Sequence, residues 1–211
     1  MPDLTLVGTV HLDPDGYRLL RRLLEELDPQ TITVDVSPYA LEFRRETGPG
    51  LLERLNAYWR TDNSLPTGLE AVAAQLEIPF EYRAAEDYAR GSGARLVAVG
   101  DSSRSRELLG LVEEELLNPE NLAALAAREG PRLEEQVARE WQRARAGAAK
   151  PPPDTASQKA LAVQDERLAG LIREYAPQGA LVHIGGWEHL WKLSELLANL
   201  RPFFTLLYTT K

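Results

Sequence analysis

Apolar residues gather in five short, nearly continuous runs along the chain. These runs are rich in β-branched and aliphatic side chains, which is typical of strands in a parallel sheet that is covered on both faces. The runs are Leu4–Val10, Thr31–Val36, Arg95–Gly100, Ala180–Ile184 and Phe203–Tyr208. We therefore expect five buried strands.

Leucines at i, i+3, i+4, i+7 spacing predict amphipathic helices after the first and the fourth strand. They are Leu20, Leu23, Leu24, Leu27, Leu190, Leu193, Leu197 and Leu200. Strands that alternate with helices predict a layered α/β fold with a mostly parallel central sheet flanked by helices.

Residues 103–175 contain no strand candidate, so we expect a helical insertion between the third and fourth strands. The predicted organisation is one α/β core, residues 1–103 and 176–211, with an insertion or arm at 104–175. A Pro-rich spacer at 151–153 interrupts the arm. The arm is interpreted as a lid, a dimerisation arm or a solvated cap, and a homodimer is one possible assembly.

Composition narrows the chemistry. The 211 residues include no Cys, which excludes disulfides, thiolate metal sites and a Cys nucleophile. Only His and carboxylates remain as strong metal ligands, and there are three His.

A net charge of −8 argues against nucleic acid or an anionic membrane as partner. No apolar run approaches the ~20 residues that span a bilayer. The N-terminal residues lack a basic targeting region, which predicts a cytoplasmic protein.

Ligands of open α/β sheets bind beyond the carboxyl ends of the strands. Polar residues lie at the carboxyl ends of four predicted strands here: His11, Asp35, Asp101 and His189. Each has a structural alternative, because the two Asp could cap helices, His11 could bond within a turn and His189 could pack as an aromatic. Both His occupy the same Gly-x-x-His frame, which favours a shared site. His183 lies inside a strand and is interpreted as structural.

Two carboxylates fall on apolar helix faces. Asp165 shares a face with Leu168 and Ile172, and Glu81 shares one with Ala84 and Ala85. A buried carboxylate is costly unless it is paired, hydrogen-bonded or metal-bound. A structural ion pair, such as Asp165 with an Arg, is the alternative to a functional role.

Several motifs, in order along the chain, resemble the TraB/Tiki family, whose superfamily also holds ChaN-like haem-binding proteins and erythromycin esterases. They are Gly8-Thr9-Val10-His11, Glu81-Tyr82-Arg83-Ala84-Ala85, the strand ending in Gly100-Asp101, and Gly186-Trp187-Glu188-His189. The family's Arg after Gly-Asp is Ser102 here, and its Arg-Asp pair is Gln164-Asp165. Arg106 or Arg167 is the expected replacement for the cationic group.

The resemblance implies a hydrolase, metal-dependent in Tiki-like members, that acts on a peptide or ester bond of a peptide or small-molecule substrate. His11 and His189 would bind a divalent ion such as Mn²⁺, Co²⁺ or Zn²⁺, or serve as base and oxyanion partner without one. Glu81 would be the general base or a third ligand, and Asp35 and Asp101 would bind the metal or orient the imidazoles.

The remaining expected role is that of Asp165, which would orient an Arg.

Two alternatives to a hydrolase are proteins without catalytic activity. One is a protein that binds haem or another ligand in the same pocket, with Tyr39 or Tyr208 as haem ligand, and the other is a regulatory protein that acts through the helical arm.

Overall fold

The computed structural model describes residues 3–62, 64–149 and 156–208. These residues form one five-stranded sheet in which all paired strands are parallel, in the order β3-β2-β4-β1-β5. The strands are β1 (Leu4–Thr9), β2 (Thr31–Val34), β3 (Arg95–Ala98), β4 (Leu181–Gly186) and β5 (Phe203–Leu206). The predicted layered α/β fold is confirmed, and the Pro-rich spacer at 151–153 lies outside the described residues.

The register of β1 and β4 brings the two Gly-x-x-His motifs together. Gly8 pairs with Gly185, and Thr9 pairs with Gly186. Strand β4 therefore runs two residues further than its apolar run, because both glycines continue the ladder with β1. The two motifs leave the sheet side by side at its carboxyl edge.

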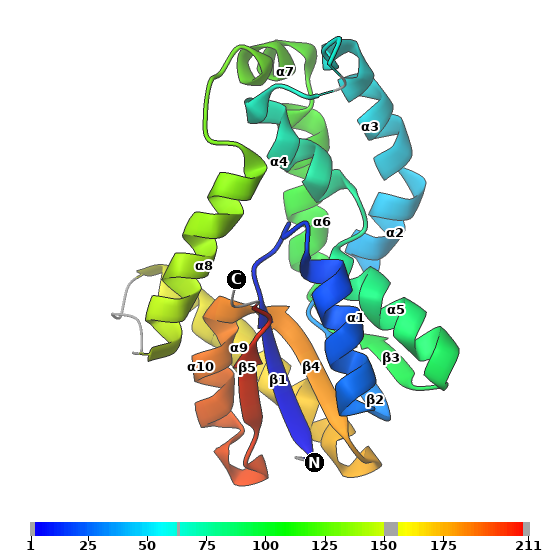
Figure 1. Ribbon diagram of the computed structural model, residues 1–211, viewed down its shortest axis with the longest axis vertical. Coiled ribbons are helices and arrows are strands. Elements are labelled where there is room, and N and C mark those ends of the chain that lie inside the picture. Colours follow the sequence, from blue (N-terminus) through cyan, green and yellow to red (C-terminus); the bar gives the residue numbers. More distant parts are fainter. Residues whose placement is uncertain (1–2, 63, 150–155, 209–211) are drawn as a thin grey trace.

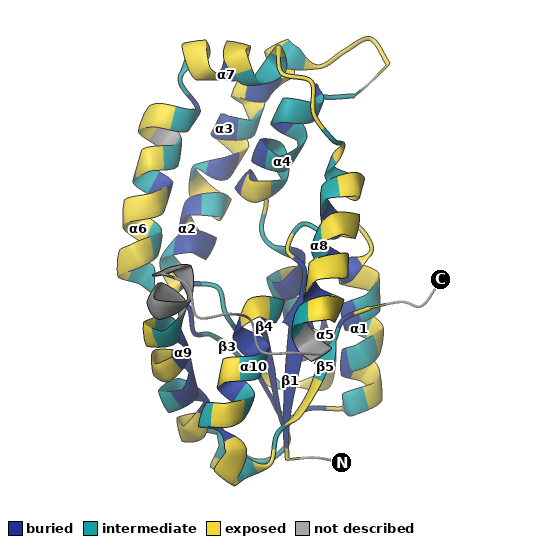
Figure 2. Cartoon of the chain, turned by 90° about the vertical axis from the view of Figure 1, so that its left-hand side faces the viewer, coloured by how far each residue is buried: buried dark blue, intermediate teal, exposed yellow. Residues whose placement is uncertain are grey.

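Helices cover both faces of the sheet (Figure 1). One hydrophobic cluster joins the sheet to α1 (Gly16–Leu27), α5 (Phe80–Ser92) and α8 (Leu133–Ala149). A second cluster joins it to α9 (Ala156–Tyr175) and α10 (Trp187–Leu196). Figure 2 shows the inner strands buried and the outward helix faces exposed. The expectation of five buried strands is wrong for β3 and β5, which lie at the two edges of the sheet and are partly exposed.

A third hydrophobic cluster lies beyond the carboxyl ends of the strands (Figure 1). It is built from two parts of the chain. The β2–β3 connection contributes α2 (Pro38–Glu46), α3 (Gly48–Leu55) and α4 (Thr67–Leu76), and the later part contributes α6 (Ser102–Leu111), the π-helix η2 (Val112–Leu116) and α7 (Pro119–Ala126). The 3₁₀ turns are η1 (Asn56–Tyr58), η3 (Ala176–Gln178) and η4 (Ala198–Leu200).

The expected division at residue 104 does not coincide with these clusters. Helix α9 belongs to the expected arm but packs on the sheet, whereas α2–α4 belong to the expected core but pack with α6 and α7. Among the described helices, none is both long enough and apolar enough to cross a membrane.

Candidate functional site

The two motif histidines flank one glycine. His11 follows β1, and His189 lies in the first turn of α10. A Cβ placed on Gly186 would lie 3.2 Å from His11 Nε2, 3.6 Å from His189 Cδ2 and 3.0 Å from a Glu188 carboxylate oxygen. The backbone of Gly186 is extended, with φ −57° and ψ 142°. A side chain at this position would therefore be tight against His11 and Glu188, whereas the backbone conformation does not require glycine.

His11 is held by a buried carboxylate. Its Nδ1 lies 2.7 Å from Oε1 of Glu81, which lies in the first turn of α5. The Thr9 hydroxyl lies 2.9 Å from the same oxygen and 3.2 Å from the Gly185 carbonyl. Burial lowers the pKa of His11, but the hydrogen bond and charge of Glu81, with Glu188 and Asp35, outweigh it and raise the pKa to about 9. The imidazole is still 59% exposed, so a ligand can reach it.

His189 has a partner of the same kind. Its Nδ1 lies 2.5 Å from Oδ1 of Asp165, on α9. Both side chains are buried. Burial lowers the pKa of His189, but the hydrogen bond and charge of Asp165, helped by Asp35 and Glu188, raise it above the ordinary value. The role expected for Asp165, orienting an Arg, is replaced by this contact with His189.

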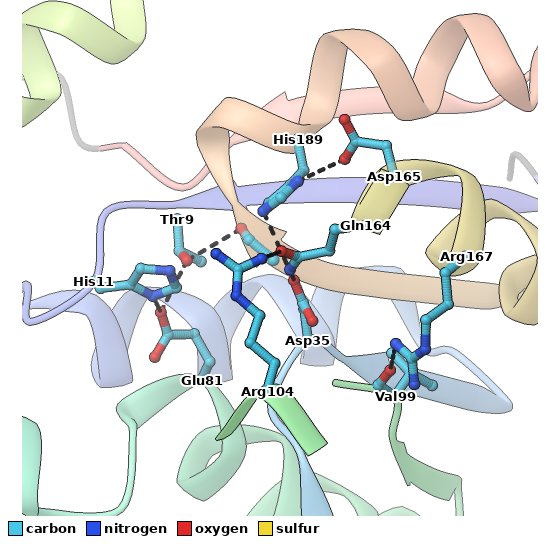
Figure 3. A network of polar contacts seen from close by, with 11 residues as sticks. Thr9, His11, Asp35, Glu81, Val99, Arg104, Gln164, Asp165, Arg167 and His189 are labelled. Carbon is cyan, nitrogen blue, oxygen red and sulfur yellow. Dashed lines mark hydrogen bonds and ion pairs between the residues drawn. The ribbon is translucent and has the colours of Figure 1, made fainter. Parts of the chain in front are cut away.

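Asp35 lies between His189 and a chain of polar contacts that runs through Gln164 to Arg104 (Figure 3). Its Oδ2 lies 3.9 Å from His189 Nε2 and accepts a hydrogen bond from the Gln164 amide at 3.0 Å. The carbonyl oxygen of Gln164 in turn accepts from Arg104 at 2.9 Å. The helix after β2 is capped by Ser37 and not by Asp35, which leaves the Asp35 carboxylate directed at the site.

His11, Glu81, His189, Asp35, Gln164 and Arg104 line one pocket of about 960 Å³, whereas Thr9 and Asp165 lie behind its lining. The pocket lies between the carboxyl ends of the strands and the helices of the third cluster. Five predicted site residues line it: His11, Asp35, Glu81, Asp101 and His189. Asp101 also caps α6, accepting from the backbone N–H groups of Arg104 and Ser103, and these bonds lower its pKa. The alternative in which Asp101 caps the following helix is therefore confirmed.

Of the two arginines expected as the cationic group, Arg167 lines the pocket and Arg106 does not. The guanidinium of Arg106 lies over the Tyr39 ring, 4.7 Å from its centre, and Arg106 does not line the pocket. Arg104 and Arg167 do line it. The reason is helical phase, because Arg104 and Arg106 are two positions apart on α6 and point in different directions.

A smaller pocket of about 270 Å³ adjoins the first at His11. Glu188 and Glu140 line it, and Glu140 accepts a hydrogen bond from the Trp187 indole at 3.0 Å. Thr9, Glu188, Gln164 and Arg104 are site residues that were not predicted from the sequence. A signal was present for the first three, because Thr9 and Glu188 lie inside the Gly-x-x-His motifs and Gln164 precedes Asp165.

His183 lies apart from this chemistry. It is fully buried in β4, and its Nδ1 is 3.0 Å from the Thr33 hydroxyl. Burial lowers its pKa to about 4, which the positive charge of His189 reinforces and the negative charge of Asp35 opposes. The imidazole is therefore neutral at pH 7.

The expected metal ligands do not form a metal centre as they are placed. Within residues 3–62, 64–149 and 156–208, no three His, Asp or Glu side chains are arranged to hold one ion. The divalent-metal prediction stays a prediction. Haem binding also stays a prediction. Neither of the tyrosines expected as its ligand, Tyr39 or Tyr208, lines the larger pocket.

Comparisons with protein-family models, with curated proteins and with solved structures give no match. The TraB/Tiki resemblance thus stays a prediction that rests on the motifs.

Proposed function

We propose that the protein is a hydrolase that cleaves an ester or peptide bond with two histidine–carboxylate pairs. The observation that carries this proposal is the matched arrangement of His11–Glu81 and His189–Asp165. In each pair a buried carboxylate engages Nδ1, and the imidazoles flank one glycine in a single pocket. The order of the Gly-x-x-His, Glu-Ala-rich and Gly-Asp motifs also supports a TraB/Tiki-like enzyme.

The carboxylates assign the reactive nitrogen. A group that holds Nδ1–H leaves Nε2 as the atom that exchanges protons with substrate. With a pKa of about 9, His11 is an imidazolium at neutral pH, so its Nε2–H can donate to the oxygen that gains negative charge as a carbonyl is attacked.

His189 is suited to the base role. Its neutral form accepts a proton at Nε2 from the attacking water, and Asp165 stabilises the imidazolium that results. Asp35, 3.9 Å from that nitrogen, is placed to orient the water. The water oxygen adds to the carbonyl carbon, the bond to the leaving group breaks, and His189 returns the proton to the leaving oxygen or nitrogen.

The two pockets meet at His11, which leaves room for both sides of the bond that is cleaved. The larger one is of the size usual for a small-molecule ligand. A small ester or a short peptide is therefore the proposed substrate class.

The test is a panel of 4-nitrophenyl esters and aminoacyl 4-nitroanilides. Wild type, His11→Gln and His189→Gln are assayed, each with EDTA and with added Mn²⁺, Co²⁺ or Zn²⁺. We expect each His variant to lose about 100-fold or more in kcat/KM. The control is Arg22→Gln, an exposed Arg paired with Glu26 outside both pockets, which should keep wild-type activity.

Two results bear on different parts of the proposal. Hydrolysis that survives both His substitutions, or no hydrolysis across the panel, contradicts the proposed site. Activity that EDTA removes and one of the ions restores supports metal dependence, whereas activity unchanged by EDTA supports the imidazole pairs alone.

A further inference from the structure

Four arginines line the larger pocket, and three of them, Arg44, Arg104 and Arg167, donate hydrogen bonds to neutral groups. Arg44 donates to the carbonyl oxygens of Gln75 and Ala40. Arg167 donates to those of Val99 and Gly100, and Arg104 donates to the Gln164 amide. Within the described ranges, none of these three arginines forms an ion pair with a carboxylate.

Arginines on the outer surface behave differently. Arg22 pairs with Glu26 at 3.0 Å, and Arg90 pairs with Asp87 at 2.9 Å. A neutral acceptor orients a guanidinium without cancelling its charge, and a guanidinium stays protonated in proteins. The pocket lining also includes five carboxylates, which are Asp13, Asp35, Glu77, Glu81 and Asp101. Among the described residues, none of these carboxylates forms an ion pair with Arg44, Arg104 or Arg167, so the charge of these guanidinium groups is left for a bound anion.

Arg104 is the best placed of the three for an anion. One of its terminal nitrogens bonds Gln164, and its remaining donors have no partner among the described residues. Figure 3 shows its side chain extending toward Gln164 at the centre of the polar chain. A guanidinium with two adjacent N–H groups free matches a carboxylate, which it can bind with two hydrogen bonds.

Apolar side chains accompany the cations with helical spacing. Leu108 lies four residues after Arg104 on α6, and Val163 lies four residues before Arg167 on α9. All four line the larger pocket. Leu108 is 53% exposed and Val163 is 72% exposed. Exposed aliphatic groups in a pocket are ready contacts for an apolar part of a ligand.

We infer that the larger pocket selects an amphipathic anion, with a carboxylate bound by Arg104 and an aliphatic chain against Leu108 and Val163. The claim that this anion is the substrate rests on the proposed hydrolase function. The claim that the pocket binds such an anion is independent of that function. The smaller pocket is lined by Glu140 and Glu188, with no Arg or Lys in its lining, so the anionic end lies on the side of the larger pocket.

The experiment is isothermal titration of the full chain with octanoate, octanamide and acetate. Octanamide removes the charge, and acetate removes the chain. We expect saturable binding of octanoate and at least roughly tenfold weaker binding of the other two, as the loss of a charged hydrogen bond or of buried methylenes requires.

Variants locate the binding. Arg104→Gln should weaken octanoate binding about tenfold and remove the preference over octanamide. Leu108→Ser, a change at an exposed position, should also weaken it. Arg22→Gln removes the same charge on the outer surface and should leave it unchanged. Equal affinity for octanamide, an Arg104→Gln protein that still prefers octanoate, or no saturable binding of octanoate would overturn the inference.

The two proposals fail separately. If octanoate binding depends on Arg104 but the protein hydrolyses no substrate of the panel, the hydrolase proposal is refuted and the anion-site proposal stands. Hydrolysis of uncharged esters that depends on His11, without octanoate binding, refutes the anion site and keeps the hydrolase.

Discussion

Asp165 and His189 meet at 2.5 Å between Oδ1 and Nδ1, across the packed helices α9 and α10. Both side chains are buried, so neither can turn to water without breaking the contact. The carboxylate on the apolar face of α9 therefore has a partner, and the partner lies in the second Gly-x-x-His motif. This contact makes α9 part of the candidate site.

Asp165→Asn is expected to lower the pKa of His189. The substitution keeps the shape of the side chain but removes the charge that favours the imidazolium, while Asp35 and Glu188 still favour it. With three His in the chain, NMR titration of the imidazole signals can follow each one. An unchanged pKa of His189 would show that the Asp165 contact does not set its basicity.

Glu81→Gln should act in the same way on the other pair. The pKa of His11 should fall from about 9 toward the ordinary value of 6.5, since Glu81 supplies the largest raising effects. The same titration measures it. Asp101→Asn, which alters a helix cap and not an imidazole partner, is the matched control. A His11 pKa that stays near 9 in Glu81→Gln would contradict the pairing.

Gly186→Ala tests the space between the two rings. The added Cβ would lie 3.2 Å from His11 Nε2 and 3.0 Å from a Glu188 carboxylate oxygen, so these two side chains must shift by a few tenths of an ångström, and it would contact His189 at 3.6 Å. We expect a loss of activity of about tenfold and a destabilisation of about 1 kcal/mol. Gly170→Ala is the control. It has open space in α9 and should stabilise the protein by roughly 0.5–1 kcal/mol. Urea unfolding and turnover of one ester measure both effects. Full activity in Gly186→Ala would contradict the close packing of the site.

His183 should make stability depend on pH in the acid range. Its pKa is about 4 in the folded state and near 6.5 when unfolded, so the unfolded chain binds the extra proton between these values. The free energy of unfolding should fall as the pH drops from 6.5 to 4, by on the order of 3 kcal/mol from this group.

The measurement compares wild type with His183→Asn, a change that keeps a polar atom near Thr33. Urea unfolding at several pH values should show a shallower acid loss for the variant. The other two histidines have raised pKa values and favour the folded state as the pH falls, but they are present in both proteins and cancel in the difference. Parallel pH curves for the two proteins would contradict the burial of a neutral His183.

The sequence predicted the parts of the site that depend on local pattern. Apolar runs identified the strands, and the rule for carboxyl ends of strands correctly placed His11, Asp35 and His189 in one pocket. Helical phase placed Glu81 and Asp165 on buried faces. Hydrophobic periodicity predicts which face of a helix is buried. It does not predict which residue of a neighbouring helix a side chain on that face contacts. Asp165 was therefore assigned to an Arg instead of His189.

Two further differences have the same physical origin. Glycines are depleted in strands, so the pattern ended β4 before Gly185 and Gly186, whereas their pairing with β1 extends it. The helices between β2 and β3 are amphipathic whichever element they face. Their packing with α6 and α7, instead of with the sheet, depends on tertiary contacts that no local pattern reports.

The most direct test of the account is a double-mutant cycle on kcat/KM for the best ester of the panel, with His11→Gln, His189→Gln and the double variant. If both histidines act in one step, each single change should cost about 100-fold or more, and the double should cost little beyond either one. Single variants with near wild-type kcat/KM, or losses that multiply in the double variant, would contradict the claim that the two histidine–carboxylate pairs form one active site.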